Sequence, residues 1–197
     1  MRKNTNRTNK TPNNVGQIRI IAGQWRGRKL PVHDLQGLRP TTDRQKETLF
    51  NWLQGQTDGA QVLDLFAGAG GLGFEALSRY ADGLVAVEMD AAAARQLKAN
   101  AATLQATAQV VQGDALAFLQ QTPTQSFDLV FVDPPFQRDL LAPTLALLSP
   151  WLAPQAWVYC ESEAGLAMPQ LPANWQLWRD KVAGQAHARL YLVESAD

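Results

Sequence analysis

An apolar segment followed at once by a glycine-rich loop constrains the fold of this chain more than any other feature. Residues 61–66 form a short, nearly continuous apolar run, and residues 68–73 read Gly-Ala-Gly-Gly-Leu-Gly. A strand without polar alternation is typical of a parallel sheet that helices cover on both faces. Glycines between such a strand and a helix let the backbone turn sharply and approach a ligand. The two segments together predict a Rossmann-like strand, loop and helix.

Strand and helix patterns alternate through the rest of the chain. We expect strands at residues 61–66, 83–88, 108–112, 127–132, 157–161, 177–182 and 189–194, and helices at residues 72–79, 91–104, 115–120 and 140–148. This alternation predicts an α/β fold with a doubly wound, mostly parallel sheet. Before it, residues 18–21 and 29–32 predict a small β-hairpin, and Thr42 with Gln45 predicts a capping box at the start of a helix.

Charge is distributed unevenly along a chain whose formal net charge is zero. Residues 1–46 hold eleven of the 18 lysines and arginines but only two of the 18 acidic residues. This asymmetry favours a polyanionic partner; a tail that only solubilises the protein is the alternative. Because basic and aromatic residues are interleaved here, we expect contacts with nucleic acid. The candidate residues for these contacts are Arg19, Trp25, Arg26, Arg28, Lys29, Arg39 and Arg44.

Composition and length limit the domain organisation and the classes of function. A chain of 197 residues with 46% hydrophobic residues can bury one core. We expect a disordered basic tail at residues 1–16, which have almost no apolar content, a hairpin and helix extension at 17–54, and a catalytic domain at 55–197.

The apolar runs are far shorter than the ~20 residues of a membrane span, and the N-terminus lacks a signal segment. We therefore expect a cytoplasmic monomer without membrane contact. Cys160 is the single cysteine and the two histidines are far apart, so no metal site is expected.

Three carboxylates identify the kind of cofactor that the glycine loop would bind. Glu88 follows Gly68 by twenty residues and ends the second predicted strand, where a carboxylate binds ribose hydroxyls. Asp64 ends the first strand, next to the loop. It would repel a pyrophosphate but balance the ammonium of S-adenosylmethionine. Asp114 follows the third strand and can accept a hydrogen bond from adenine, although Asp64 and Asp114 could also be simple caps.

Asp133, Pro134, Pro135 and Phe136 follow the fourth predicted strand directly. In an open α/β sheet the loops after the first and fourth strands lie close together at the carboxyl edge. A carboxylate and a rigid carbonyl can hold the two protons of an exocyclic base amine, and an aromatic ring can stack on the base. The tetrapeptide therefore predicts a site for methyl transfer to such an amine, with a rigid turn as the structural alternative.

Several longer motifs resemble one family. Residues 18–30, 38–44, 48–53, 64–70 and 133–136 are similar to the bacterial 16S ribosomal RNA guanine-N2 methyltransferases, although this family usually has Ser or Thr where this chain has Ala69. The resemblance implies a seven-stranded class I methyltransferase sheet, S-adenosylmethionine as cofactor and 16S ribosomal RNA, in the small subunit or an assembly intermediate, as substrate. The cofactor-binding residues that it implies are Asp64, Phe66, Ala67, Gly68, Gly70, Glu88, Met89, Asp114 and Ala115.

Other functions remain open from the residues alone. The tetrapeptide at residues 133–136 would serve the N6 amine of adenine in DNA or RNA equally well. A non-catalytic RNA-binding assembly factor could keep the same fold, and an NAD-dependent oxidoreductase could use the same glycine loop. The segment from Arg39 to Arg44 could close over cofactor or RNA, or could form only the entry turn of the following helix. Trp25 could stack on RNA or pack inside the hairpin.

Overall fold

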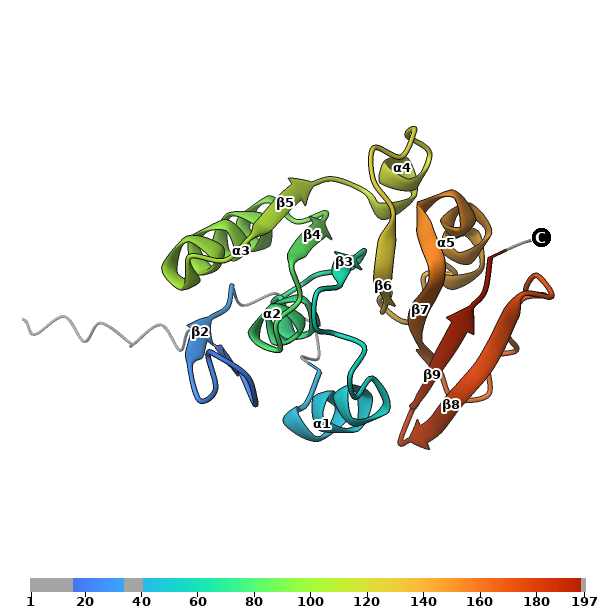
Figure 1. Cartoon of the computed structure of the whole chain (residues 1–197), viewed down its shortest axis with the longest axis horizontal. Coiled ribbons are helices and arrows are strands. Elements are labelled where there is room, and N and C mark those ends of the chain that lie inside the picture. The colour runs from blue at the N-terminus through green and yellow to red at the C-terminus, as the bar shows by residue number, and fades with distance from the viewer. Residues whose placement is uncertain (1–15, 34–40, 196–197) are drawn as a thin grey trace, which may run out of the picture.

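A seven-stranded sheet forms the centre of the computed structural model, which describes residues 16–33 and 41–195 (Figure 1). The strand order is β5-β4-β3-β6-β7-β9-β8. The first five strands in that order are mutually parallel, whereas β9 is antiparallel to β7 and β8. The strands are β3 Gln61–Asp64, β4 Gly83–Glu88, β5 Ala108–Gln112, β6 Phe127–Val132, β7 Leu152–Glu163, β8 Trp175–Ala183 and β9 Ala186–Val193. The predicted doubly wound, mostly parallel sheet is confirmed.

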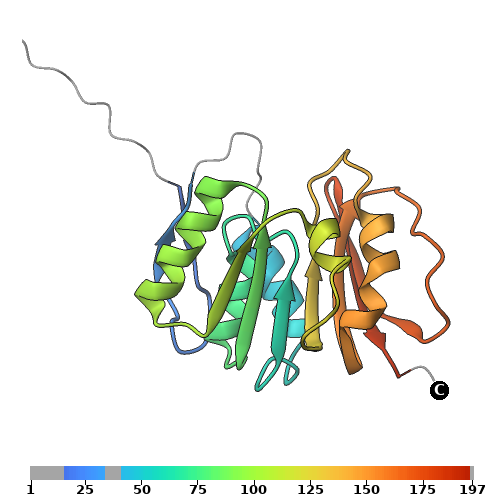
Figure 2. The same ribbon diagram turned by 90° about the horizontal axis from the view of Figure 1, so that it is seen from above.

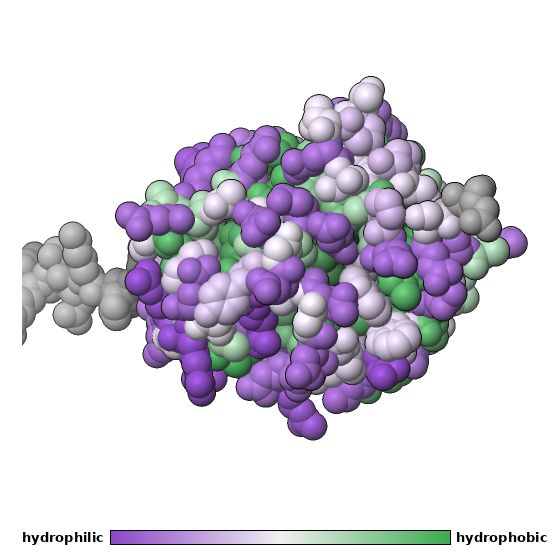
Figure 3. Space-filling view, in the orientation of Figure 1, coloured by the Kyte–Doolittle hydropathy of each residue, from purple (hydrophilic) through white to green (hydrophobic). Residues whose placement is uncertain are grey.

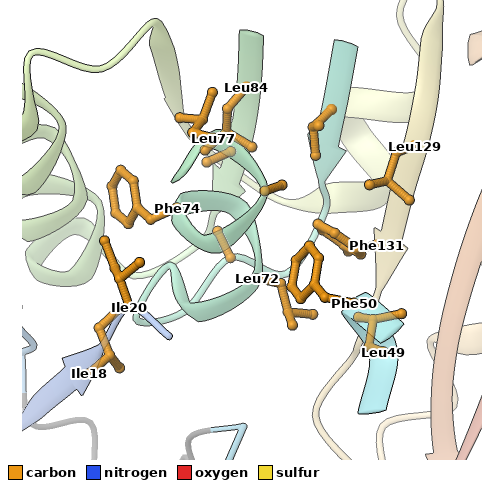
Figure 4. Close-up of a cluster of buried hydrophobic side chains, with 14 of the residues drawn as sticks. Ile18, Ile20, Leu49, Phe50, Leu72, Phe74, Leu77, Leu84, Leu129 and Phe131 are labelled. Atoms are coloured by element: carbon orange, nitrogen blue, oxygen red, sulfur yellow. The ribbon is translucent and has the colours of Figure 1, made fainter. Parts of the chain in front are cut away.

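Helices cover both faces of the sheet. The helices are α1 Asp43–Trp52, α2 Gly71–Ser78, α3 Ala91–Leu104, α4 Ala115–Leu119 and α5 Leu141–Leu148, followed by the short 3₁₀ helix η1 Ser149–Trp151. Side chains of α1, α2 and α3 pack with Val62 and Phe131 in one apolar cluster. Figure 4 shows the part of this cluster around Phe50, Phe74 and Phe131. Side chains of α4 and α5 pack with Leu63 and Val130 in a second cluster. Successive strand residues thus enter opposite layers, which explains the nearly continuous apolar runs of the sequence. The surface seen in Figure 3 is mainly hydrophilic, with smaller hydrophobic groups between.

The N-terminal hairpin packs beside the helical layer of α1, α2 and α3. Its strands, β1 Gln17–Arg19 and β2 Lys29–Pro31, are antiparallel and lie next to α3, at the end of the molecule opposite β8 and β9 (Figure 2). Ile18, Ile20 and Leu30 are buried and belong to the same apolar cluster as Phe131. The hairpin and the sheet therefore share one hydrophobic core.

A buried carboxylate fastens the hairpin segment to α2. Glu75 is fully buried and accepts hydrogen bonds from the backbone N–H groups of Ile21, at 2.8 Å, and Ala22, at 3.1 Å. The Arg79 guanidinium, 2.9 Å away, balances its charge. Such a group must be paired, because an isolated buried charge is very costly. The α2 helix that follows the glycine loop is thus also the anchor of the N-terminal extension.

The predicted helix starts and strand ends agree with the structure in most places. Thr42 and Gln45 form the predicted capping box of α1, and β4, β5, β6 and α3 have the predicted bounds. Strand β7 begins at Leu152, earlier than predicted, because its pairing with β6 continues through a register shift between Phe127 and Leu129. The tail predicted at residues 1–16 lies outside the described residues except for Gly16.

Candidate active site

The loop between β3 and α2 has the conformation that its glycines predict. Gly68 and Gly70 have positive φ angles of 49° and 81°. A Cβ at Gly70 would lie 2.6 Å from the Phe74 ring and 2.7 Å from a Leu97 methyl group. Because β-carbons do not approach other atoms so closely, the loop requires glycine at position 70. Gly70 is also the N-cap residue of α2, so the loop leads directly into the backbone N–H groups of the first helical turn.

Glu88 at the end of β4 holds this loop in place. One carboxylate oxygen accepts a hydrogen bond from the Gly68 N–H at 2.7 Å, and the other accepts one from the Asp90 N–H at 2.7 Å. A carboxylate offers about four lone-pair positions, so these two bonds leave acceptor capacity for ligand hydroxyl groups. Sequence reasoning gave Glu88 a ribose-binding role but did not anticipate that it also positions the glycine loop.

Asp64 at the end of β3 is a buried carboxylate at the start of α2. Only 3% of its surface is exposed. It accepts a hydrogen bond from the Gly73 N–H at 3.2 Å and another from the Phe66 backbone. Burial, with a smaller contribution from the nearby Glu88 charge, raises the pKa of Asp64 from 3.8 to about 7, although the two backbone bonds oppose this shift. A cation beside Asp64 would relieve the cost of ionising it.

Asp133 follows β6 and lies close to Asp64, because β6 pairs with β3 in the centre of the sheet. The Thr41 side chain hydrogen-bonds to Asp133. Burial, then the charges of Glu161 and Asp64, raise the pKa of Asp133 well above its usual value, and the Thr41 bond opposes this shift. The structure therefore brings the predicted cofactor loop and the predicted acceptor motif together.

A small pocket lies beside Asp133, between the loop that follows β6 and the end of β7. Its walls include Pro134, Pro135 and Phe136 on one side and Glu161 with Glu163 on the other. The Gln137 N–H donates a hydrogen bond to Glu163 at 2.5 Å, which joins the loop after β6 to the end of β7. Pro134 is buried and Phe136 is partly exposed. Carboxylates and an aromatic side chain therefore surround this pocket.

Glu161 is a site residue that sequence reasoning missed. It lies one residue beyond the Val132 and Cys160 pair, in register with Asp133, and only 7% of its surface is exposed. The Tyr159 hydroxyl donates a hydrogen bond to it at 2.9 Å. The available signal was an acidic residue at the end of the predicted strand 157–161, the same pattern that identified Asp64 and Glu88.

The remaining predicted cofactor residues surround the same edge of the sheet. Asp114 is exposed and caps α4 through the Ala117 N–H at 2.8 Å, as the structural alternative predicted. Met89 is 74% exposed, next to Glu88. Phe66 is partly exposed and Ala67 is buried in the loop after β3, and Ala115 is buried as the first residue of α4.

The predicted RNA-binding residues are more scattered. Arg26 and Arg28 are exposed in the hairpin turn, which contacts the C-terminal end of α2 through the Gln24 N–H and the Ser78 carbonyl at 2.8 Å. The glycine loop lies at the other end of this eight-residue helix, about 12 Å away. Trp25 lines a pocket with apolar residues of α2 and α3, which supports a packing role.

The other predicted RNA contacts lie in β1, β2 and α1 or outside the described residues. Arg19 forms an ion pair with Asp43 at 2.7 Å at the start of α1. Arg44, in the first turn of α1, and Lys29, in β2, are exposed. Arg39 lies outside the described residues. Thr41, from the same predicted closing segment, contacts Asp133 as described above.

Among residues 16–33 and 41–195, no group of three or more His, Cys, Asp or Glu side chains could hold a metal ion. No helix in the same part of the chain is long and apolar enough to cross a membrane.

The sheet order, the glycine loop and the paired acidic strand ends define a class I, Rossmann-like methyltransferase fold. More particularly, the chain belongs to the family described as Conserved hypothetical protein 95, whose model matches residues 18–192. It is 57% identical to ribosomal RNA small subunit methyltransferase D of Escherichia coli K12, over 94% of this chain and 96% of that protein. It is 48% identical to the protein of the same name from Haemophilus influenzae, over 92% of this chain and 96% of that protein.

Solved structures agree with this membership. A putative methyltransferase from Escherichia coli, 57% identical, superposes with a TM-score of 0.86 over 92% of this chain and all of that chain. A Thermus thermophilus 16S rRNA N2 G1207 methyltransferase, in complex with AdoMet and guanosine, has a TM-score of 0.63 over 92% of this chain and 50% of that chain. At 21% identity, this second likeness supports the fold alone.

Proposed function

We propose that this protein transfers a methyl group from S-adenosylmethionine to the exocyclic N2 of a guanine in 16S ribosomal RNA. The observation that carries the proposal is that two groups of residues lie close together: the loop with Asp64 and Glu88, and the Asp133 motif on the neighbouring strand. Membership in a family with curated rRNA small subunit methyltransferases supplies the substrate class. The resemblance in residues 18–44 supports guanine over adenine.

The residues present fit S-adenosylmethionine. The cofactor supplies a methyl group on a positively charged sulfur. Asp64, buried and adjacent to the first turn of α2, would balance positive charge at the methionine end, and the Gly68 and Gly70 backbone would receive its carboxylate. Glu88 would bind the ribose hydroxyls with its remaining lone pairs. Asp114 and Ala115 would contact the adenine, with Phe66, Ala67 and Met89 lining the same edge.

Asp133 would orient the acceptor amine. An aromatic-ring amine is a weak nucleophile because its lone pair is delocalised into the base, so its position relative to the methyl group matters most. The Asp133 carboxylate would accept one N–H of the amine and balance the positive charge that develops on nitrogen. The Pro134 carbonyl would accept the second N–H, and Phe136 would stack on the base. A strong general base is unnecessary, because the methylated amine is very acidic before it loses its proton.

The substrate context and the cellular location complete the proposal. We infer that the enzyme acts as a cytoplasmic monomer on 16S RNA within the small subunit or an assembly intermediate. Residues 17–54 would form an RNA-binding extension, and residues 55–197 the catalytic domain. The exposed cations Arg26, Arg28, Lys29 and Arg44 would contact phosphates, and RNA affinity would then fall steeply with salt.

The decisive experiment measures labelled methyl transfer to small subunits that lack the modification, followed by digestion and identification of the base. N2-methylguanine is expected; N6-methyladenine, or RNA binding without transfer, would overturn the proposal. Asp133→Asn keeps the size of the side chain and removes its charge, so kcat should fall at least about a hundredfold with cofactor affinity nearly unchanged. Asp58→Asn, which replaces an exposed aspartate just before β3 and thus at the other edge of the sheet, is the matched control and should keep full activity.

A further inference from the structure

A β-bulge in the edge strand β8 changes which side chains face which side of the sheet. Pairing between β8 and β9 shifts between Leu177 and Arg179, so two residues of β8 stand where one is expected. Trp178 and Arg179, although consecutive, therefore point to the same face. The Arg179 guanidinium lies 5.0 Å from the centre of the Trp178 ring. Trp178 in turn meets Trp157 of β7, with the ring centres 5.7 Å apart.

Lys181 joins these two side chains because strand alternation resumes after the bulge. Arg179 pairs with Leu190, and Lys181 pairs with Ala188. Leu190 and Ala188 both pack in the apolar cluster that α1 covers, so Arg179 and Lys181 face the α1 side of the sheet. Trp178, Arg179 and Lys181 form what we call the β8 cationic face. All three are exposed, and Trp178 retains 46% of its accessible surface.

The acidic residue between the two cations points away from the β8 cationic face. Asp180 occupies the opposite side of the strand, where His187 hydrogen-bonds to it at 2.9 Å. Without the bulge, Trp178 and Asp180 would share one face, and Arg179 would lie on the other. The bulge thus separates the acidic side chain from an aromatic ring and two cations, which is the combination that single-stranded RNA favours.

Strand register connects the β8 cationic face to the acceptor site. Val132 pairs with Cys160, so Asp133 and Glu161 are neighbours at the next position. Ala188 pairs with both Glu161 and Lys181. Asp133, Glu161, Ala188 and Lys181 therefore form one row across β6, β7, β9 and β8. Three strand spacings separate the ends of this row, about 14 Å, which places the cations close to a nucleotide held at Asp133.

We propose that the β8 cationic face binds the RNA segment that flanks the target nucleotide. Arg179 and Lys181 contact phosphates, and Trp178 stacks on a base. This inference rests on the proposed function, since it needs an RNA acceptor at Asp133. It adds a contact surface on the C-terminal edge strand, far from the basic hairpin at the other end of the sheet (Figure 2). The charge and the exposed ring match a polyanion with planar bases better than a protein partner.

The test compares two charge-matched variants. Arg179→Gln with Lys181→Gln removes the cations of the β8 cationic face, whereas Arg95→Gln with Lys98→Gln removes two exposed cations of α3, beside the opposite edge of the sheet. Affinity for unmodified 16S RNA transcribed in vitro is measured over a range of salt concentrations. The β8 variant should weaken binding at least about tenfold, and the slope of log affinity against log salt should fall by about 1.4–1.8. The α3 variant should keep the wild-type slope.

Trp178 tests stacking separately. Trp178→Ala should weaken RNA binding about tenfold at every salt concentration, and Trp178→Phe should restore most of it. S-adenosylmethionine affinity and thermal stability of the β8 charge variant should match the wild type. If the β8 and α3 variants gave the same slope of log affinity against log salt, the inference would be wrong. It would also be wrong if the β8 variant bound assembled subunits weakly but naked RNA normally, because that result would indicate a protein contact. An inactive wild-type enzyme would instead contradict the proposed function.

Discussion

The buried Asp64 carboxylate makes the stability of the protein without cofactor depend on pH. Burial raises its pKa from 3.8 to about 7, so the folded state binds this proton more tightly than the unfolded state. The contribution of Asp64 therefore favours folding most at low pH and is lost as pH rises toward 7. At 1.36 kcal/mol for each pKa unit, the full change is about 4 kcal/mol. Asp64→Asn removes the ionisation and should remove this dependence.

Urea unfolding at pH 5, 6, 7 and 8 without cofactor measures the effect. The free energy of unfolding of Asp64→Asn minus that of the wild type should increase by about 1.4 kcal/mol for each pH unit up to pH 7, and then level off. The matched control is Asp128→Asn. The Asp128 carboxylate also accepts a backbone hydrogen bond, from the Gln61 N–H at 2.8 Å, but Asp128 lies at the opposite edge of the sheet. If Asp128→Asn changed the pH profile as Asp64→Asn does, the effect would come from the loss of any carboxylate and not from the burial of Asp64.

Cofactor binding should affect Asp64 in the opposite direction to burial, because it favours the ionised form of the carboxylate. A cationic ligand favours ionised Asp64, so at pH 6 binding of S-adenosylmethionine to the wild type should release about 0.9 proton from this group. Calorimetry in buffers of different ionisation enthalpy measures that release. Asp64→Asn should bind the cofactor at least about tenfold more weakly and without this proton. A difference in stability that stays constant from pH 5 to 8, or a variant that binds as tightly as the wild type, would refute the reasoning.

Two further substitutions test how the N-terminal extension supports the site. Thr41→Val removes the hydroxyl that stabilises ionised Asp133, so the pKa of Asp133 should rise. The acidic limb of the profile of kcat against pH should then move to higher pH, with little change in melting temperature. An unmoved profile would exclude this role. Gly23→Ala places a Cβ 1.7 Å from the Ser78 carbonyl oxygen and should cost at least about 3 kcal/mol of stability. Gly27→Ala has a similar φ but open space around it, so in chemical denaturation it should cost only about 1–2 kcal/mol.

Local sequence patterns predicted most of the fold because these helices and strands depend mainly on residues that are close together in the sequence. The apolar runs of β4 and β6 are continuous since helices cover both of their faces, and Thr42 caps α1 with the residue three positions later. The early start of β7 depends on pairing with β6 through a register shift. A pairing of this kind joins residues distant in sequence, and no local pattern encodes it.

The candidate site was predictable where one strand end carries one acidic residue. Asp64, Glu88 and Asp133 follow this rule. Glu161 follows it in the predicted strand 157–161, although β7 continues to Glu163. Two features were not predictable from spacing. Thr41 hydrogen-bonds to Asp133, which lies 92 positions later in the sequence. Glu75 binds the backbone of the hairpin segment, although its neighbours in α2 are mainly apolar. Both are long-range polar contacts, which depend on the completed packing of the N-terminal extension.

Three acidic residues at neighbouring strand ends explain why the site suits its proposed ligands together. Asp64 and Glu161 both raise the pKa of Asp133, and burial raises the pKa of Asp64 and Asp133 alike. A cationic cofactor beside Asp64 lowers the pKa of Asp64 directly and weakens its repulsion of Asp133. Ionised Asp133 is then the better acceptor for the N–H of an amine. Cofactor and acceptor should therefore bind with positive coupling, and by thermodynamic linkage each should increase affinity for the other by the same factor.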